Sequence, residues 1–298
     1  MAQTVLISGA SGLIGTAVAD ALAQDGWAVK RLVRRQGFGA DEIGWAPERG
    51  LDYKTVEGFD AIVHLAGEPV FGLWTTEKMK AIHDSRVEPT AALSRALAHC
   101  ERKPKVMVCA SAVGYYGDRG EETLTEESAP GGGFLPRTCV EWEAAAQPAK
   151  DAGIRVTHMR TGIVLSKRGG ALKQMLPAFK LGIAGKLGSG EQYFPWVALE
   201  DVVGIIRFAL TKAALEGPIN VAAPEAVTNA EFTKTLAKVL RRPAIIPVPA
   251  FVLKLLPGKM AQEAILASAK VVPAKLLSAG FAFQYPELEN ALRKELER

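Results

Sequence analysis

The sequence predicts an α/β fold with a doubly wound parallel sheet and a smaller, mostly helical C-terminal domain. Apolar, strand-like runs alternate with helix-like stretches, which is typical of a parallel sheet covered by helices on both faces. The first such run, residues 4–8, breaks into Gly9, Gly12 and Gly15 before an alanine-rich helical pattern. A chain of 298 residues is also long enough to bury one large core and a smaller second one.

The three glycines predict a Rossmann-type dinucleotide site. Gly9 permits a sharp turn out of the strand, Gly12 lets a pyrophosphate approach the bare backbone, and Gly15 lets the helix pack closely on the sheet. The phosphates then lie at a helix N-terminus, where unpaired N–H groups favour negative charge. The alternative is an ordinary glycine-rich turn. The predicted cofactor contacts in this loop are Gly9, Ser11, Gly12, Leu13, Ile14 and Gly15.

The end of the second expected strand, residues 26–34, indicates which dinucleotide is bound. Arg34 and Arg35 follow the glycines by about 20 residues, where dinucleotide domains place the residue that reads the adenosine ribose. An acidic residue there would hold the 2′-hydroxyl of NAD, whereas arginine pairs with the 2′-phosphate of NADP. No acidic residue occurs between Asp25 and Asp41. The sequence therefore favours NADP, the alternative being that both arginines merely end an exposed strand.

The next segments continue the alternation of strands and helices. Residues 59–67 form an apolar strand that ends in small residues, and ligands of open α/β sheets bind beyond the carboxyl ends of strands. The alternative is a buried strand that simply stops at a glycine turn. Residues 75–98 predict one or two helices broken near Pro89, with an arginine on the end facing the glycine loop. These segments add Leu65, Ala66, Gly67, Glu68 and Arg86 to the predicted cofactor site.

Two further strands are expected at residues 105–112 and 155–160. The first ends in Ser111, and Tyr115 and Tyr116 follow it. A hydroxyl at the carboxyl end of a strand beside a cofactor can polarise a carbonyl or an alcohol, so these three residues are the catalytic candidates. Arg160, at the end of the second of these strands, completes the predicted cofactor contacts.

The motifs together resemble those of a known enzyme class. The glycine triplet, Asp60–Gly67 and Ser111–Gly117 look like an extended short-chain dehydrogenase/reductase, the class that contains sugar-nucleotide epimerases and dehydratases. Later motifs resemble its atypical YfcH-type epimerase subgroup, namely Gly114–Gly117, Trp142–Ala146, Arg160–Leu165, Gly188–Gly190 and Val227–Phe232. The resemblance covers essentially the whole chain. It implies an NADP-binding Rossmann domain with a small C-terminal substrate domain, but no particular reaction.

The catalytic motif of the wider class is absent. Extended members use Tyr-x-x-x-Lys, in which the lysine lowers the pKa of the tyrosine and orients the ribose. None of the five tyrosines has a lysine four residues later. Aligning the expected helix on Glu143 puts Leu135 at the tyrosine position and Cys139 at the lysine position. The tyrosines after the fourth strand could substitute or could simply wall the pocket, and Ala112 could occupy the catalytic serine position.

The predicted domain boundaries follow from a change in composition. Residues 1–165 and 197–223 are assigned to the NADP-binding domain, and residues 166–196 and 224–298 to a smaller lid and C-terminal substrate domain. The glycine-rich segment 166–196 surrounds one short helix at 172–181, as in a lid. Further helices are expected near residues 229–240, 251–256 and 260–269, between proline-rich joints.

Composition narrows the class of partner. The formal net charge is +4 and basic residues are interspersed with acidic ones, which argues against nucleic acid. The three cysteines lack CxxC spacing and no leader precedes the first strand, so a cytoplasmic location is expected. No apolar run reaches the roughly 20 residues that span a bilayer, and the four histidines lack zinc-type spacing, so neither a membrane nor a metal is expected.

Two functions fit these observations. The first is an NADP-dependent oxidoreductase or epimerase that acts on a small polar substrate such as a nucleotide sugar, as a monomer or homodimer. The second is a non-catalytic NADP(H)-binding sensor or regulatory module. The absent Tyr-x-x-x-Lys favours the second, whereas a lid and a substrate domain favour the first, which we prefer.

Overall fold

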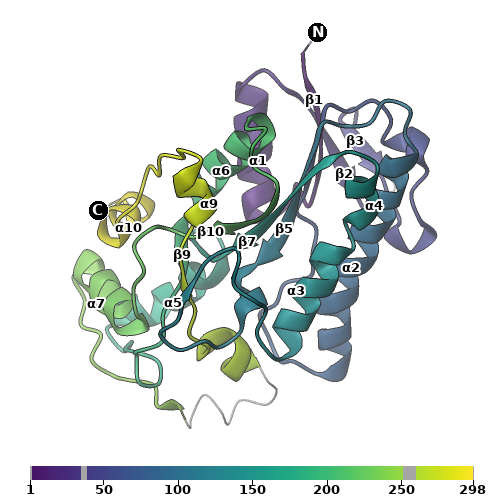
Figure 1. Ribbon diagram of the computed structural model, residues 1–298. Coiled ribbons are helices and arrows are strands. Elements are labelled where there is room, and N and C mark those ends of the chain that lie inside the picture. The colour runs from purple at the N-terminus through teal and green to yellow at the C-terminus, as the bar shows by residue number, and fades with distance from the viewer. Residues whose placement is uncertain (1, 35–38, 251–259, 298) are drawn as a thin grey trace.

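The computed structural model describes residues 2–34, 39–250 and 260–297, and its centre is one parallel sheet with helices on both faces (Figure 1). Its seven strands lie in the order β3-β2-β1-β4-β5-β7-β10. The chain winds outward from β1 in one direction and from β4 in the other, so the strand order reverses between these two. This confirms the predicted doubly wound, Rossmann-type sheet. The strands are β1 (Thr4–Ser8), β2 (Ala28–Val33), β3 (Glu42–Gly44), β4 (Ala61–His64), β5 (Val106–Ala112), β7 (Arg155–Thr161) and β10 (Gly217–Val221).

Helices cover both faces because successive strand residues point to opposite sides. Val5 and Ile7 of β1 pack in one core with α1 (Leu13–Gln24) and α6 (Leu199–Thr211). Leu6 packs in a second core on the opposite face, with the helices α2 (Thr76–His99) and α4 (Gln147–Asp151). α3 (Phe134–Ala144) lies alongside α2.

α2 is a single continuous helix, although a break near Pro89 was expected. Proline lacks the N–H that would bond the Ser85 carbonyl, four residues earlier in an α-helix. The neighbouring carbonyls of Ile82 and Arg86 accept additional bonds, from the Arg86 guanidinium at 2.9 Å and from the Thr90 hydroxyl at 2.6 Å, but these do not replace the missing one. Pro89 itself is buried against the sheet side of the helix, where its ring adds apolar contact. Packing of the helix therefore outweighs the local cost of the proline.

A second lobe has its own apolar core. It is built from three helices and a two-stranded ribbon that packs beneath them, and Figure 1 shows these helices gathered beside one end of the main sheet. α7 begins at a capping box in which Thr228 and Glu231 satisfy each other's backbone N–H groups. The elements of the second lobe are α5 (Gly170–Leu181), α7 (Asn229–Leu240), α10 (Leu288–Leu296), β8 (Ile163–Leu165) and β9 (Trp196–Ala198).

Short elements connect the two lobes. β6 (Thr123–Leu124) pairs with β11 (Lys270–Val271), and α9 (Ala274–Ser278) packs on β10 of the main sheet. The helix expected at 260–269 is a short π-helix, Ala261–Ile265, and the one expected at 251–256 lies outside the described residues. The part of the chain that the structure describes also contains three 3₁₀ turns: η1 (Pro47–Arg49), η2 (Tyr53–Thr55) and η3 (Val113–Tyr116).

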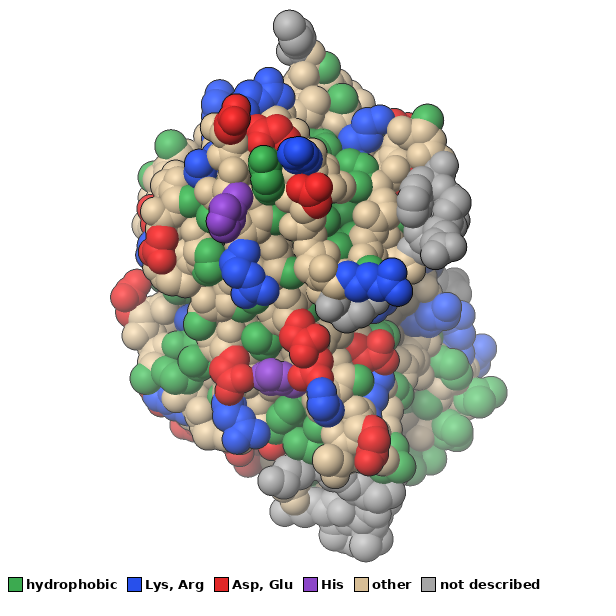
Figure 2. Space-filling model, turned by 90° about the vertical axis from the view of Figure 1, so that its right-hand side faces the viewer, with side chains coloured by type: hydrophobic (Ala, Val, Ile, Leu, Met, Phe, Trp, Pro, Cys, Tyr) green, Lys and Arg blue, Asp and Glu red, His purple; other side chains and the backbone are tan. Residues whose placement is uncertain are grey.

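The surface is mixed in charge. Figure 2 shows the face that carries α2, α3 and α4, where acidic and basic side chains alternate without a large area of one sign. Across residues 2–34, 39–250 and 260–297, no helix combines the length and the apolar character needed to cross a membrane.

Candidate active site

The glycine loop is built to bring bare backbone against the end of β4. Gly9 has a positive φ of 69°, and a Cβ there would lie 2.7 Å from the Leu65 carbonyl carbon and oxygen. A Cβ on Gly15 would lie 2.8 Å from Ala10 Cα and overlap the Gly9 carbonyl oxygen. Gly12 caps α1 in an extended conformation without a side-chain hydrogen bond, so the first-turn N–H groups receive no capping oxygen from this residue. The loop therefore offers an anion a tight backbone cradle.

Arg34 lies exposed at the end of β2, next to the loop, because β2 pairs with β1 in register through Ser8 and Leu32. Glu68, on the other side, is held by Lys78 at 2.7 Å, and the Ser85 hydroxyl accepts a hydrogen bond from its N–H at 3.0 Å. The Lys78 hydrogen bond lowers the pKa of Glu68, with smaller contributions from the charges of Arg34 and Arg86. Around Glu68 this edge of the sheet therefore carries the positive charges of Lys78, Arg34 and Arg86. Arg35 lies outside the described residues.

Leu65, Ala66 and Gly67 follow β4 and meet the glycine loop and α2. The Leu65 N–H donates to the Ser8 carbonyl at 3.2 Å, which continues the β1–β4 pairing into the loop. A Cβ on Gly67 would lie 3.3 Å from Arg86 Cζ, so the guanidinium packs on bare backbone. The structure therefore brings the predicted residues 9–15, 34, 65–68 and 86 to one edge of the sheet.

A buried histidine network under this edge was not predicted. His64 Nδ1 lies 2.6 Å from the Ser8 hydroxyl, and Nε2 lies 3.0 Å from the Thr90 hydroxyl. Thr90 donates its only proton to the Arg86 carbonyl and accepts from Trp142 Nε1 at 3.0 Å, so Nε2 of His64 must carry the proton. Burial lowers the pKa of His64 to about 4, so the ring is neutral near pH 7. The sequence signal that could have indicated this network is the polar residue that ends each of two apolar strands, Ser8 in β1 and His64 in β4.

A second buried network occupies the ends of β5 and β7. Ser111 and Arg160 are register partners, and both bond the carboxylate of Glu143 on α3. The Ser111 hydroxyl donates at 2.7 Å, and Arg160 donates from Nε and Nη2 at 2.9 Å each. The Arg160 side chain is only 3% exposed. The bidentate pair with Glu143 uses two of the hydrogen-bond donors of Arg160 within the fold.

The two predicted tyrosines differ sharply. Tyr116 is fully buried, its hydroxyl lies 2.6 Å from Asn220 Oδ1, and it accepts from Arg160 Nη1 at 3.1 Å. Burial raises the pKa of Tyr116 despite the nearby arginine. Tyr115 is partly exposed and its ring stacks on Arg160, with Cζ 3.4 Å from the ring centroid. Arg160 and Tyr116 are therefore paired with other groups of the fold, Ser111 is buried against Glu143, and Tyr115 is the one partly exposed side chain among the three catalytic candidates. The catalytic roles of Ser111, Tyr115 and Tyr116 and the cofactor contact of Arg160 stay predictions.

The positions aligned with Tyr-x-x-x-Lys are apolar or neutral. Leu135 packs beside Gly114, where an added Cβ would lie 3.4 Å from Leu135 Cβ. Cys139 is buried, with Sγ 3.8 Å from the Ala112 carbonyl, and burial raises its pKa to about 12. α3 therefore presents neither a tyrosine nor an ammonium group to the end of β5.

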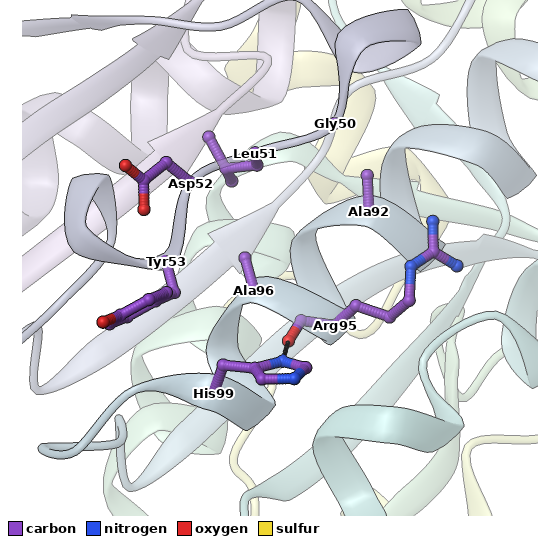
Figure 3. Close-up of a pocket in the computed structure, with 8 residues that line it drawn as sticks. All are labelled: Gly50, Leu51, Asp52, Tyr53, Ala92, Arg95, Ala96 and His99. Atoms are coloured by element: carbon purple, nitrogen blue, oxygen red, sulfur yellow. Dashed lines mark hydrogen bonds between the residues drawn. The ribbon is translucent and has the colours of Figure 1, made fainter.

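Two open hollows lie away from this edge. One, of about 340 Å³, lies between η1, η2 and the last turns of α2, where His99 bonds the Arg95 carbonyl at 2.7 Å (Figure 3). α2 starts beside the carboxyl end of β4 and runs back along the sheet, so its last turns are remote from the glycine loop. The other hollow, of about 350 Å³, borders α7. Among the described residues no group of His, Cys, Asp and Glu could hold a metal ion.

Known proteins share this sequence and fold. The profile of the NAD dependent epimerase/dehydratase family matches residues 5–222, and that of a domain of unknown function, DUF1731, matches residues 248–295. The chain is 39% identical over 290 residues to the epimerase family protein Mb2239 of Mycobacterium bovis, covering 97% of this chain and 96% of that protein. It is 36% identical over 298 residues to the epimerase family protein SDR39U1 of Homo sapiens, covering 97% and 98%.

Solved structures of related proteins have the same fold as this chain. The crystal structure of human SDR39U1 (isoform 2) with NADPH superposes with a TM-score of 0.90 at 34% identity, covering 99% of this chain and 100% of the other. The nucleoside-diphosphate sugar epimerase from Corynebacterium glutamicum gives a TM-score of 0.82 at 36% identity, covering 99% of this chain and 58% of the other. The glycine cradle, the parallel sheet and these similarities together show that the chain belongs to the NAD-dependent epimerase/dehydratase family.

Proposed function

We propose that this protein is an NADP-dependent oxidoreductase or epimerase that acts on a small polar substrate, such as a nucleotide sugar, without Tyr-x-x-x-Lys. The observation that carries the proposal is the backbone cradle at Gly9, Gly12 and Gly15, with Arg34 exposed beside it. The similar human protein was solved with NADPH, which supports the same cofactor here. A cytoplasmic location, a small-molecule partner and a monomeric or homodimeric state are parts of this proposal.

The residues fit NADP in charge and shape. The first-turn N–H groups of α1 would receive the pyrophosphate, as at other helix N-termini that bind phosphates. Arg34 would pair with the 2′-phosphate, since guanidinium and phosphate form charge-assisted hydrogen bonds. When bound, the nicotinamide supplies or accepts a hydride. Tyr115, partly exposed above Arg160, is then the candidate to give or take the proton.

Titration of NADPH and NADH by fluorescence tests the cofactor assignment. Arg34→Ala should weaken NADPH binding tenfold or more, about 1.5–3 kcal/mol, and leave NADH binding nearly unchanged. Arg31→Ala is the matched control, because it removes an exposed arginine from the same strand but not from its end. Equal affinity of the wild type for both cofactors would contradict the assignment.

Single-turnover oxidation of bound NADPH with a panel of sugar nucleotides and small carbonyl compounds tests the activity. Oxidation by any of these compounds would identify the substrate class. Tight NADPH binding without oxidation by any compound would instead favour a cofactor-binding sensor.

A further inference from the structure

The hollow of about 350 Å³ beside α7 is lined, among the described residues, by three cations and by no acidic side chain. Lys234 lies on α7, Arg242 follows this helix, and Lys186 lies in the loop after α5. The other lining side chains are small: Ala230, Thr233, Ala237, Pro243 and Ala244. None of them belongs to the sheet edge that carries the glycine loop, and Figure 1 shows α5 between α7 and the main sheet. A ligand of this hollow is therefore distinct from the cofactor.

Lys186 is held in position at the hollow. Its aliphatic chain lies across Gly190, which has a positive φ of 79° and where a Cβ would lie 2.8 Å from Lys186 Cδ. The ammonium group donates to the Ser189 carbonyl at 2.9 Å. An ammonium group has three protons, so this bond leaves donors for a ligand. Lys186 is thus a positioned cation with unused hydrogen-bonding capacity.

The walls of the hollow are joined by backbone hydrogen bonds. The Ala230 N–H donates to the Gly190 carbonyl at 2.9 Å, which ties the first turn of α7 to the loop after α5. The Val248 N–H donates to the Lys186 carbonyl at 3.0 Å, which ties the segment after α7 to the same loop. A site that is arranged before binding loses less conformational entropy when a ligand enters.

Thr233 adds a hydroxyl that the fold does not use. The residue is 4% exposed, and its hydroxyl has no hydrogen-bond partner among the described residues. Ala230, Thr233, Lys234 and Ala237 lie on one face of α7, because they are three or four residues apart. Burying a hydroxyl without a partner costs free energy, which a bound hydrogen-bond acceptor would offset. Thr233 can therefore bond a ligand in the hollow.

The cations of the hollow differ from their neighbour on the same helix. Lys238, one turn after Lys234, bonds Glu289 at 2.6 Å. Lys234 and Arg242 have no carboxylate within 4.0 Å in the part of the chain that the structure describes. Like charges around one hollow repel each other and attract an anion. Guanidinium and ammonium groups are the side chains that most often bind phosphate.

We propose that this hollow binds a small organic phosphate. The three cations and the Thr233 hydroxyl hold the phosphate, and the apolar body of the molecule lies against the alanines and Pro243. The volume of about 350 Å³ falls within the range of ligand pockets, which begins at about 300 Å³. The apolar side chains favour an organic phosphate over free phosphate, because free phosphate has no apolar part to bury.

Phenyl phosphate, inorganic phosphate and phenol are the probes, and the amide chemical shifts of the full chain report where each one binds. Phenyl phosphate should shift the amides of residues 230–244 until they saturate. Inorganic phosphate should bind at least fivefold more weakly because it lacks the ring, and phenol should not bind because it lacks the charge. Equal affinity for the two phosphates would overturn the organic ligand. Shifts confined to residues 9–15, or no saturation at millimolar phenyl phosphate, would overturn the site.

Substitutions locate the site. Lys234→Ala and Arg242→Ala should each raise the Kd of phenyl phosphate fivefold or more. Thr233→Val, which keeps the shape of the side chain and removes the hydroxyl, should raise it about threefold. Lys238→Ala is the matched control, because it removes a paired lysine from the same helix, and it should change the Kd less than twofold. Equal effects of Lys234→Ala and Lys238→Ala would overturn the proposal. NADPH is absent from these titrations, so their result is independent of the proposed function.

Discussion

The loop after β1 and the strand ends of β5 and β7 lie along one sheet edge, yet they use polar groups in opposite ways. At the glycine loop, small residues leave backbone N–H groups without a capping side chain. At the ends of β5 and β7, Ser111 and Arg160 both donate to Glu143, and Arg160 also donates to the Tyr116 hydroxyl. A polar residue near a crevice can bind a ligand only with hydrogen-bonding capacity that the fold has not used. The first region therefore keeps hydrogen-bonding capacity for a ligand, whereas the second uses its polar groups within the fold.

Glu143→Ala has the largest expected effect and tests whether the ends of β5 and β7 support the fold without binding the cofactor. It leaves Arg160, 3% exposed, without its carboxylate, and breaking a buried pair costs about 3–5 kcal/mol of unfolding free energy. NADPH affinity of the folded fraction should stay within twofold. Urea unfolding and NADPH titration measure the two effects. Glu289→Ala, which removes a half-buried surface carboxylate that pairs with Lys238 and Arg293, is the control and should change stability little. Lost NADPH affinity with unchanged stability would place Glu143 in the binding site.

Gly15→Ala tests the opposite region. Its Cβ would overlap the Gly9 carbonyl oxygen, so the loop must move, with a cost of about 1–3 kcal/mol and a large loss of NADPH affinity. Gly204→Ala in α6 is the matched control, because its Cβ would make an ordinary 3.4 Å contact with Phe281 Cζ and should stabilise the helix slightly. Unchanged NADPH binding in Gly15→Ala would argue against the cradle.

The buried His64 should make the stability of the folded protein depend on pH. His64 has a pKa of about 4 in the folded protein and 6.5 as its ordinary value, so the unfolded chain takes up the proton first. Stability from this residue is complete above pH 6.5, falls as pH decreases toward 4, and changes no further below that. The loss between pH 7 and pH 5 should be about 2 kcal/mol.

Urea unfolding of the wild type and His64→Gln at pH 7 and pH 5 measures this loss. The variant should show a pH dependence smaller by about that amount. His158, whose pKa burial also lowers to about 4, keeps its own contribution in both proteins. Identical pH dependence in the two proteins would show that His64 does not titrate as its burial requires.

The smallest expected effect separates the adjacent tyrosines. Tyr116→Phe removes a buried hydroxyl from Asn220 and Arg160 and should cost about 1–2 kcal/mol. Tyr115→Phe should leave stability unchanged and abolish single-turnover NADPH oxidation if Tyr115 transfers the proton. Thermal unfolding and that assay report on the two variants. Full activity in Tyr115→Phe would exclude Tyr115 as the group that transfers the proton.

Local sequence was sufficient for the parts of this protein that depend on backbone alone. Alternating apolar runs predicted the parallel sheet and its helices, and the spacing of Gly9, Gly12 and Gly15 predicted the cradle. These glycines act because they have no side chain, and that property is known from the residue type alone. Arg34 was likewise readable, because its position after β2 follows from strand order. The capping box of Thr228 and Glu231 begins α7 where the pattern placed a helix.

Tertiary structure decided what the polar side chains do. Ser111 and Glu143 are 32 residues apart, and Arg160 and Tyr116 are 44 apart, so no local pattern shows that they are already paired. Pro89 stays inside α2 because packing of the buried helix face outweighs its local cost. The guanidinium of Arg86 packs against Gly67 and Trp142, which belong to other elements of the fold. Whether a polar side chain is buried and already hydrogen-bonded depends on contacts between residues that are far apart in the chain. The spacing of residues in the sequence does not show these contacts.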